Sequence, residues 1–209
     1  MIRLLRALWR SLRTPWGAPR PKHMDSEPVI HVEPPPSAPV GRPGYSLRIP
    51  RVLLAQMRPD LHRTHAFAYE RVGFLLTREA EGSDGRILLA RRYEPVLEEE
   101  YIEDRSVGAR INRDAIRRML RHALAGESVF HVHLHAHQGV PGFSHVDKMN
   151  LSELIPSFCA VASRATHGAL LLSNDHGIAQ CWNAGRDGAF PMSAITVVGY
   201  PLLRWEVLS

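Results

Sequence analysis

Cysteine is scarce in this chain of 209 residues, which contains only Cys159 and Cys181. Two cysteines this far apart provide neither a disulfide framework nor the paired spacing of a structural zinc site. We therefore expect both to be small apolar residues of the core. Arg6 and Arg10 interrupt the apolar residues near the N-terminus. This pattern argues against a secretory signal and favours a reducing, cytoplasmic environment.

Long apolar runs and nucleic-acid signatures are missing as well. No segment approaches the roughly 18 uncharged apolar residues of a transmembrane helix, so we do not expect one. The net charge of +5 is modest. No basic patch with interleaved aromatic residues is present, which argues against binding to nucleic acid. The hydrophobic content of 44% is sufficient for a true core.

The N-terminal part of the chain differs in composition from the rest. Residues 1–14 place apolar side chains at helical spacing opposite arginines. They are expected to form an amphipathic basic helix that contacts a partner or a membrane surface, or else a weakly structured tail. Residues 15–45 are rich in proline and are expected to be a semi-extended linker. The folded domain is expected to span residues 46–209.

Strand and helix signals alternate within this domain. We expect helices over residues 113–125, capped by Asn112, and over residues 147–163. A short helix over 56–62 is less clear, and 65–77 is expected to be a helix end that leads into a strand. The remaining strands are expected at 46–52, 86–96, 128–137, 169–173, 178–183, 195–200 and 202–207. The expected fold class is therefore α/β (α+β), with a mixed sheet flanked by helices.

Histidines recur at every second position late in the expected strand 128–137. His131, His133, His135 and His137 would share one face of a strand, with neighbours roughly 6–7 Å apart. Two imidazoles at this spacing can bind one metal ion, and Asp147 in the following segment can supply a third ligand. Three protein ligands leave a fourth position for water, as in catalytic zinc sites. The pattern does not decide which two histidines bind.

These residues resemble the signature of the JAB/MPN (JAMM) metallopeptidases. That signature consists of an upstream glutamate, a His-x-His pair, a short loop and Ser-x-x-Asp. Here the similar residues are Glu70, His135, His137, Ser144 and Asp147, and the resemblance extends over about residues 46–205. It implies one Zn²⁺ per chain, bound by His135, His137 and Asp147. It further implies that Glu70 is the general base and acid, and that Ser144 stabilises the oxyanion.

The spacing of this motif departs from the family pattern. The family usually has seven residues between the second histidine and the serine, whereas six separate His137 from Ser144. The pair His133 and His135 would leave eight. We expect His135 and His137 to be the ligands, because the strand should end at the ligands and Gly139 and Gly142 can shorten the loop. His133 is then expected to contact one of the metal-binding side chains without binding the ion itself.

The resemblance also implies a substrate class. The expected reaction is hydrolysis of an amide or isopeptide bond at the C-terminal tail of a ubiquitin-like protein. Residues 93–101 are expected to border the tail groove. The loop that contains Pro141 and Phe143 also resembles bacterial members associated with ubiquitin-like conjugation and phage defence, and this resemblance implies E1- and E2-like enzymes as partners. Two alternatives remain: a non-catalytic MPN-like scaffold, and a zinc amidohydrolase for a small molecule.

Overall fold

The computed structural model describes residues 44–83, 85–104, 106–185 and 187–206. The expected helix over 1–14 and nearly all of the expected linker over 15–45 lie outside these residues. The first described element is strand β1 (Gly44–Pro50). Gly44 and Tyr45 therefore belong to the sheet, whereas the sequence predicted that they end the linker.

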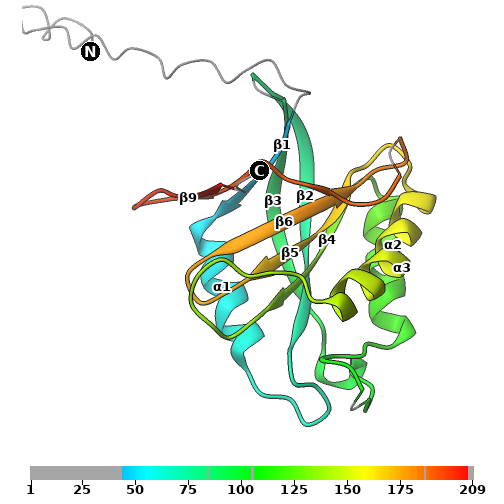
Figure 1. Cartoon of the computed structure of the whole chain (residues 1–209). Coiled ribbons are helices and arrows are strands. Elements are labelled where there is room, and N and C mark those ends of the chain that lie inside the picture. The colour runs from blue at the N-terminus through cyan, green and yellow to red at the C-terminus, as the bar shows by residue number, and fades with distance from the viewer. Residues whose placement is uncertain (1–43, 84, 105, 186, 207–209) are drawn as a thin grey trace, which may run out of the picture. The chain divides into compact units, whose positions relative to one another are not determined.

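Within the described residues, nine strands form one mixed sheet (Figure 1) in the order β7-β6-β5-β4-β2-β3-β1-β8-β9. After β1, the strands are β2 (Val72–Gly82), β3 (Gly85–Pro95), β4 (Ser128–Leu134), β5 (His167–Leu172), β6 (Gly177–Trp182), β7 (Phe190–Pro191), β8 (Ala194–Val198) and β9 (Leu203–Glu206). The helices are α1 (Arg51–His62), α2 (Arg113–Leu124), α3 (His145–Val161) and the short 3₁₀ helix η1 (Glu98–Glu100). The expected α/β class with a mixed sheet is confirmed.

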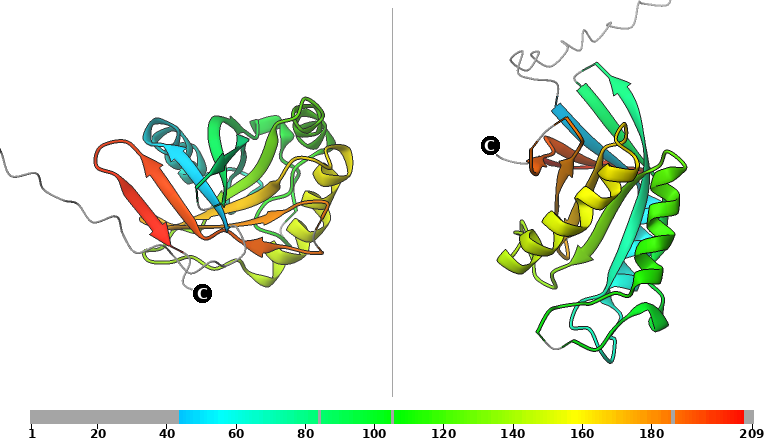
Figure 2. Two further views of the ribbon diagram at one scale, coloured as in Figure 1. Left: turned by 90° about the horizontal axis from the view of Figure 1, so that it is seen from above. Right: turned by 90° about the vertical axis from the view of Figure 1, so that its right-hand side faces the viewer.

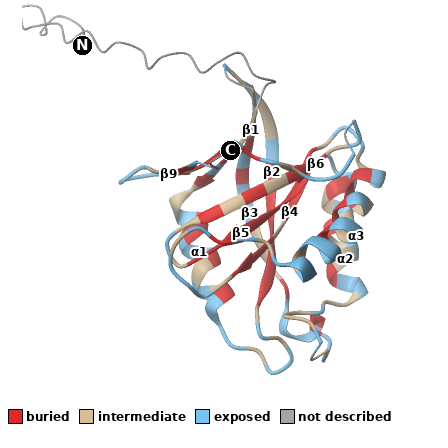
Figure 3. Cartoon of the chain, in the orientation of Figure 1, coloured by how far each residue is buried: buried red, intermediate tan, exposed pale blue. Residues whose placement is uncertain are grey.

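Helices cover both faces of the sheet, with α1 on one face and α2 and α3 on the other (Figure 1). The alternation of side chains along β2 explains this arrangement. Leu75 packs in the core beneath α1, whereas Phe74 and Leu76 pack against α2 and α3. Figure 2 shows the strong curvature of the sheet, and Figure 3 shows that its buried residues concentrate on the central strands. Each large apolar side chain that is fully buried contributes about 1.5–3 kcal/mol to stability.

Local sequence signals set the ends of α2. Asn112 accepts hydrogen bonds from the backbone N–H groups of Asp114 (2.9 Å) and Ala115 (3.2 Å), as expected for its predicted capping role. Gly126 follows the helix with a φ of +85°, a conformation that favours glycine. Cys159 and Cys181 are both free and buried, as predicted. No helix in the described part of the chain is long and apolar enough to cross a membrane.

Three segments differ clearly from the predicted elements. Residues 65–71 are not helical, because Phe67 N donates to His65 Nδ1 (3.0 Å) and other amides of this segment bond to a distant loop. Helix α1 instead begins at Arg51, where the end of a strand was expected. Strand β4 ends at Leu134, three residues before the predicted end. The chain turns immediately afterwards, with His137 N donating to His135 O (2.8 Å).

His167, the first residue of β5, is a fully buried histidine away from the histidine run. Its Nδ1 accepts a hydrogen bond from Val129 N (3.1 Å). The single ring proton is therefore on Nε2, and a second proton would bring an N–H group against the Val129 N–H group. Burial lowers the pKa of His167 from 6.5 to about 4. The folded chain thus resists protonation at this site.

We expect this histidine to make stability depend on pH. Between about pH 6.5 and pH 4, His167 is protonated in the unfolded chain but stays neutral in the folded chain. The free energy of unfolding therefore decreases as the pH falls. His167 is expected to contribute about 3 kcal/mol to the free energy of unfolding at pH 7, and this contribution is lost by pH 4. Urea unfolding of the metal-free chain should reveal it. In His167→Asn, which keeps an acceptor but cannot titrate, the decrease should be smaller by about that amount. An equal decrease in both proteins would contradict the prediction.

Candidate metal centre

The pairing of β2 with β4 brings Glu70 near the histidine run. The two strands are antiparallel, and Val72 lies opposite His133. Two residues before Val72 is Glu70, and two residues after His133 is His135. Residues directly opposite each other in an antiparallel pair project from the same face. The strand register thus directs Glu70, His133 and His135 to one side of the sheet.

Glu70 is held from a distant loop by Gly108. The Gly108 carbonyl accepts hydrogen bonds from Tyr69 N (2.8 Å) and Glu70 N (3.2 Å). A Cβ atom at position 108 would lie 3.0 Å from Glu70 Oε2, which is closer than ordinary van der Waals contact. Glycine at this position therefore leaves room for the Glu70 carboxylate. No feature of the local sequence pointed to this role for Gly108.

Asp147 is placed by the first turn of α3. Ser144 is the N-cap residue, and its Oγ accepts a hydrogen bond from Asp147 N (3.1 Å). In return, Ser144 N donates to Asp147 Oδ2 (2.7 Å), which completes a capping box. The accepting hydroxyl of Ser144 keeps its own hydrogen for donation. The Ser-x-x-Asp spacing thus starts the helix and fixes the Asp147 carboxylate at the same time.

Four side chains meet at this point: Glu70, His133, His135 and Asp147, with one ligand atom of each within 4.8 Å of all the others. His133 Nε2 lies 3.4 Å from Asp147 Oδ1, and His135 Nε2 lies 3.6 Å from Asp147 Oδ2. Glu70 Oε1 is 3.7 Å from His135 Nε2. Ligand atoms about 2.1 Å from one tetrahedral ion are roughly 3.4 Å apart. The spacing of the group therefore suits a metal ion, whose identity the geometry leaves open.

The burial of His133 supports the same conclusion. Its side chain is 3% exposed, and neither ring nitrogen has a hydrogen-bond partner. A buried polar atom without a partner is costly. A metal ion bound to Nε2 would remove part of this cost, because the lone pair would then have a partner. The donor set, two imidazoles with carboxylates, is one that binds zinc.

Protonation states in the group also suit metal binding. Burial alone would raise the pKa of Asp147, but His133 and the hydrogen bonds from Ser144 hold it well below its usual range. Asp147 is therefore an anionic carboxylate at neutral pH. Burial, and then the nearby His133, lower the pKa of His131 to about 3, so that its ring is neutral. His131, two residues before His133 on the same face of β4, packs edge-on against Phe74.

His137, predicted as a ligand, is not brought into this group. Its Nδ1 lies 2.8 Å from Gln138 O, and its ring centroid is 6.3 Å from that of His135. The reason is the early end of β4, since strand alternation no longer applies beyond His135. His133, predicted to support a ligand, instead lies in the group together with His135. His145 is exposed and lies outside the group.

The four side chains line a cleft of about 990 Å³. Its other walls come from residues 104 and 106–111 and from α3, including Val146 and Leu154. Residues 93–101, predicted to border this groove, do not line it. Glu100 in that run is 6% exposed and paired with Arg118 at 2.6 Å. Glu100, in the acidic run Glu98–Glu100, therefore has a structural role, and it does not contact the cleft.

No protein-family model matches the chain, and no curated protein matches it. Among solved structures, the N-terminal domain of STIL from Trichoplax adhaerens is similar at 13% sequence identity and a TM-score of 0.34. The alignment covers 65% of this chain and 40% of that one, so this chain spans less than half the length of that neighbour. A likeness this distant carries no functional argument. The functional proposal therefore rests on the chemistry of the four clustered residues.

Proposed function

We propose that this chain is a zinc-dependent peptidase or isopeptidase of the JAB/MPN (JAMM) type, acting at the C-terminal tail of a ubiquitin-like protein. The observation that supports it is the meeting of Glu70, His133, His135 and Asp147 at the cleft. These side chains come from a loop, a strand end and a helix start, in the order of the family motif. The supported ligand set contains His133 in place of the predicted His137.

The roles within the group follow from where each side chain lies. His133, His135 and Asp147 would hold the ion, because His133 is buried without a hydrogen-bond partner and Asp147 is anchored to the helix. The Glu70 side chain is 35% exposed, and its Oε1 lies 3.7 Å from His135 Nε2. A carboxylate that stays accessible and outside the ligand set suits a proton carrier.

In the proposed reaction, Glu70 accepts a proton from the attacking water at one carboxylate oxygen. It then delivers the proton to the nitrogen of the leaving amine, so that protons balance over the cycle. The Ser144 hydroxyl donates to the oxygen of the scissile carbonyl as negative charge develops there. A bound zinc ion supplies Lewis-acid polarisation and increases the acidity of a coordinated water. Hydrolysis breaks the amide bond and yields a carboxylate and an amine.

The surroundings of the cleft favour a macromolecular substrate over a small amide. Tyr69 and Val146 both line the cleft, and they are 79% and 43% exposed, respectively. Exposed apolar side chains around a site are typical of surfaces that bind proteins. We propose the tail of a ubiquitin-like protein as the substrate and its E1- and E2-like enzymes as further partners. The two free cysteines are consistent with the proposed cytoplasmic setting.

Metal analysis combined with a cleavage assay tests this proposal. We expect about one zinc per chain, and cleavage of ubiquitin-like proteins fused through their C-termini to a reporter. A chelator should abolish cleavage and added Zn²⁺ should restore it, because the ion supplies the electrophile. A chain without metal and without cleavage would favour the scaffold. Zinc binding with hydrolysis of small amides only would favour the amidohydrolase.

A further inference from the structure

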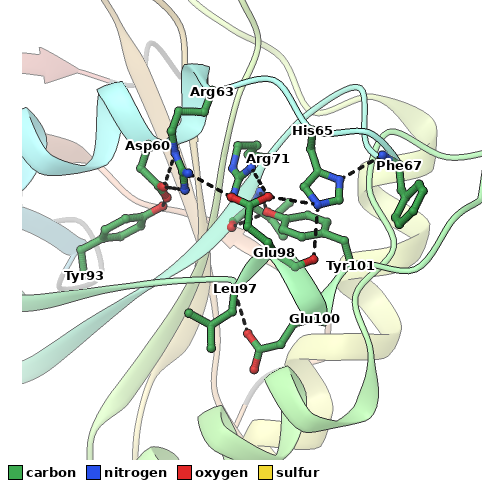
Figure 4. Close-up of polar contacts among 11 residues, drawn as sticks. Asp60, Arg63, His65, Phe67, Arg71, Tyr93, Leu97, Glu98, Glu100 and Tyr101 are labelled. Atoms are coloured by element: carbon green, nitrogen blue, oxygen red, sulfur yellow. Dashed lines mark hydrogen bonds and ion pairs between the residues drawn. The ribbon is translucent and has the colours of Figure 1, made fainter.

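A network of ion pairs surrounds Arg71, the residue that follows Glu70 in the sequence (Figure 4). Arg71, the next residue, is 2% exposed, and its guanidinium forms a two-pronged pair with Glu98. Nη2 donates to Oε1 at 2.7 Å and Nη1 donates to Oε2 at 3.1 Å. The guanidinium carbon also lies 5.2 Å from the centre of the Tyr101 ring. Bidentate pairs of this kind fix direction as well as distance.

Glu98 binds the same segment of chain at its other end. Arg63 Nη1 donates to Glu98 Oε1 (2.9 Å), and His65 Nε2 lies 3.2 Å from Glu98 Oε2. Residues 63–71, which join α1 to β2, contain no helix or strand of their own. One carboxylate on η1 therefore holds this segment near its start and again at its end, next to Glu70.

The residue after Arg71 is fixed from the same region. The Tyr101 hydroxyl accepts a hydrogen bond from Val72 N (3.0 Å) and donates one to Val72 O (3.1 Å). The Arg71 side chain is buried in the network, while the neighbouring Glu70 side chain lines the cleft. With positions 71 and 72 both held, the backbone at Glu70 has little freedom to turn its carboxylate away from His135.

We propose that Glu98 is a positioning residue for Glu70. By holding Arg63, His65 and Arg71, it fixes the segment that carries the Glu70 carboxylate to the cleft. The catalytic consequence rests on the proposed function, whereas the positioning concerns the chain alone. Glu99, on the same short helix, is exposed and has no such role. The acidic run thus contains one residue that orders the site and one that is merely solvated.

The test compares Glu98→Gln with the matched control Glu99→Gln. The Glu98 side chain is 55% exposed, so its loss of charge should not unfold the domain. Arg71→Lys is a second variant, which keeps the charge but loses the two-pronged geometry. We expect amide hydrogen exchange at Tyr69 and Glu70 to be about tenfold faster or more in both variants and unchanged in the control. Exchange at Asp147, in the α3 capping box, should not change.

Kinetics supply the second measurement. We expect zinc content and KM to be unchanged, and kcat to fall about tenfold, since a misplacement of about 1 Å can cost ~100-fold in rate. Unchanged exchange at Tyr69 and Glu70 in Glu98→Gln would overturn the proposal. Faster exchange throughout the domain would overturn it too, as a sign of general destabilisation. If the wild-type chain cleaves no amide, the proposed function fails, and the exchange contrast alone decides the positioning role.

Discussion

Substitution of His133 by alanine is expected to remove zinc from the chain, while substitution of His137 by alanine leaves it bound. His133 Nε2 is buried without a hydrogen-bond partner and lies 3.4 Å from Asp147 Oδ1, whereas His137 is outside the group of four clustered residues. Loss of a direct ligand should weaken binding by well over the 10–100-fold that is typical of losing an outer partner of a ligand. Metal content after dialysis against a competing chelator measures the difference.

The two substitutions form a matched pair, because both histidines belong to one run and line one cleft. His135→Ala should behave like His133→Ala, since the proposed site uses both. Urea unfolding of each variant in chelator shows whether metal loss merely reflects a damaged fold. Zinc retained in His133→Ala and lost in His137→Ala would restore the ligand pair predicted from the sequence, His135 and His137, and would require the turn after β4 to rearrange on metal binding.

Glu70→Gln is expected to lower kcat by about 10²–10⁴-fold with zinc still bound. Glutamine has nearly the same shape as glutamate but cannot accept the proton from water, and a general base typically contributes a factor of this size. KM should change little, because the interaction is needed in the transition state and not for binding the tail. Steady-state kinetics on a ubiquitin-like fusion, with metal analysis of the same sample, provide the measurement.

Glu153→Gln serves as the control for this substitution. Glu153 also lines the cleft but is not in the four-residue group. A similar loss of kcat in both variants would point to the overall charge of the cleft, and not to proton transfer by Glu70. Loss of zinc in Glu70→Gln would make Glu70 a ligand, and another group would then have to carry the proton.

Features with local causes could be predicted from the sequence. Asn112 caps α2 as expected, because capping depends on a few adjacent residues. The start of the histidine strand and the Ser144–Asp147 pair were also recognisable, since strand alternation and the Ser-x-x-Asp spacing are local patterns. The mixed sheet followed from the interleaved signals for strands and helices.

Features that depend on distant contacts could not be predicted. His137 leaves the strand face because the turn after β4 is held from elsewhere, with Gly139 N donating to Asp175 Oδ1 (2.8 Å). Gly139 has a φ of +87°, so the chain leaves the extended conformation in the turn that follows His137. The role of Glu98 could not be predicted from its run of acidic residues, because its cationic partners are 27 to 35 positions away in the chain.

The double role of Asp147 ties the helix start to the proposed ion. One of its oxygens bonds to the N–H group of Ser144, and the other lies nearest to His133. Fraying of the first turn of α3 would withdraw this carboxylate, so occupancy by the ion and helix initiation are thermodynamically linked. The free energy of binding therefore also strengthens the attachment of α3 to the sheet, and loss of the ion loosens the wall of the cleft against which a substrate would lie.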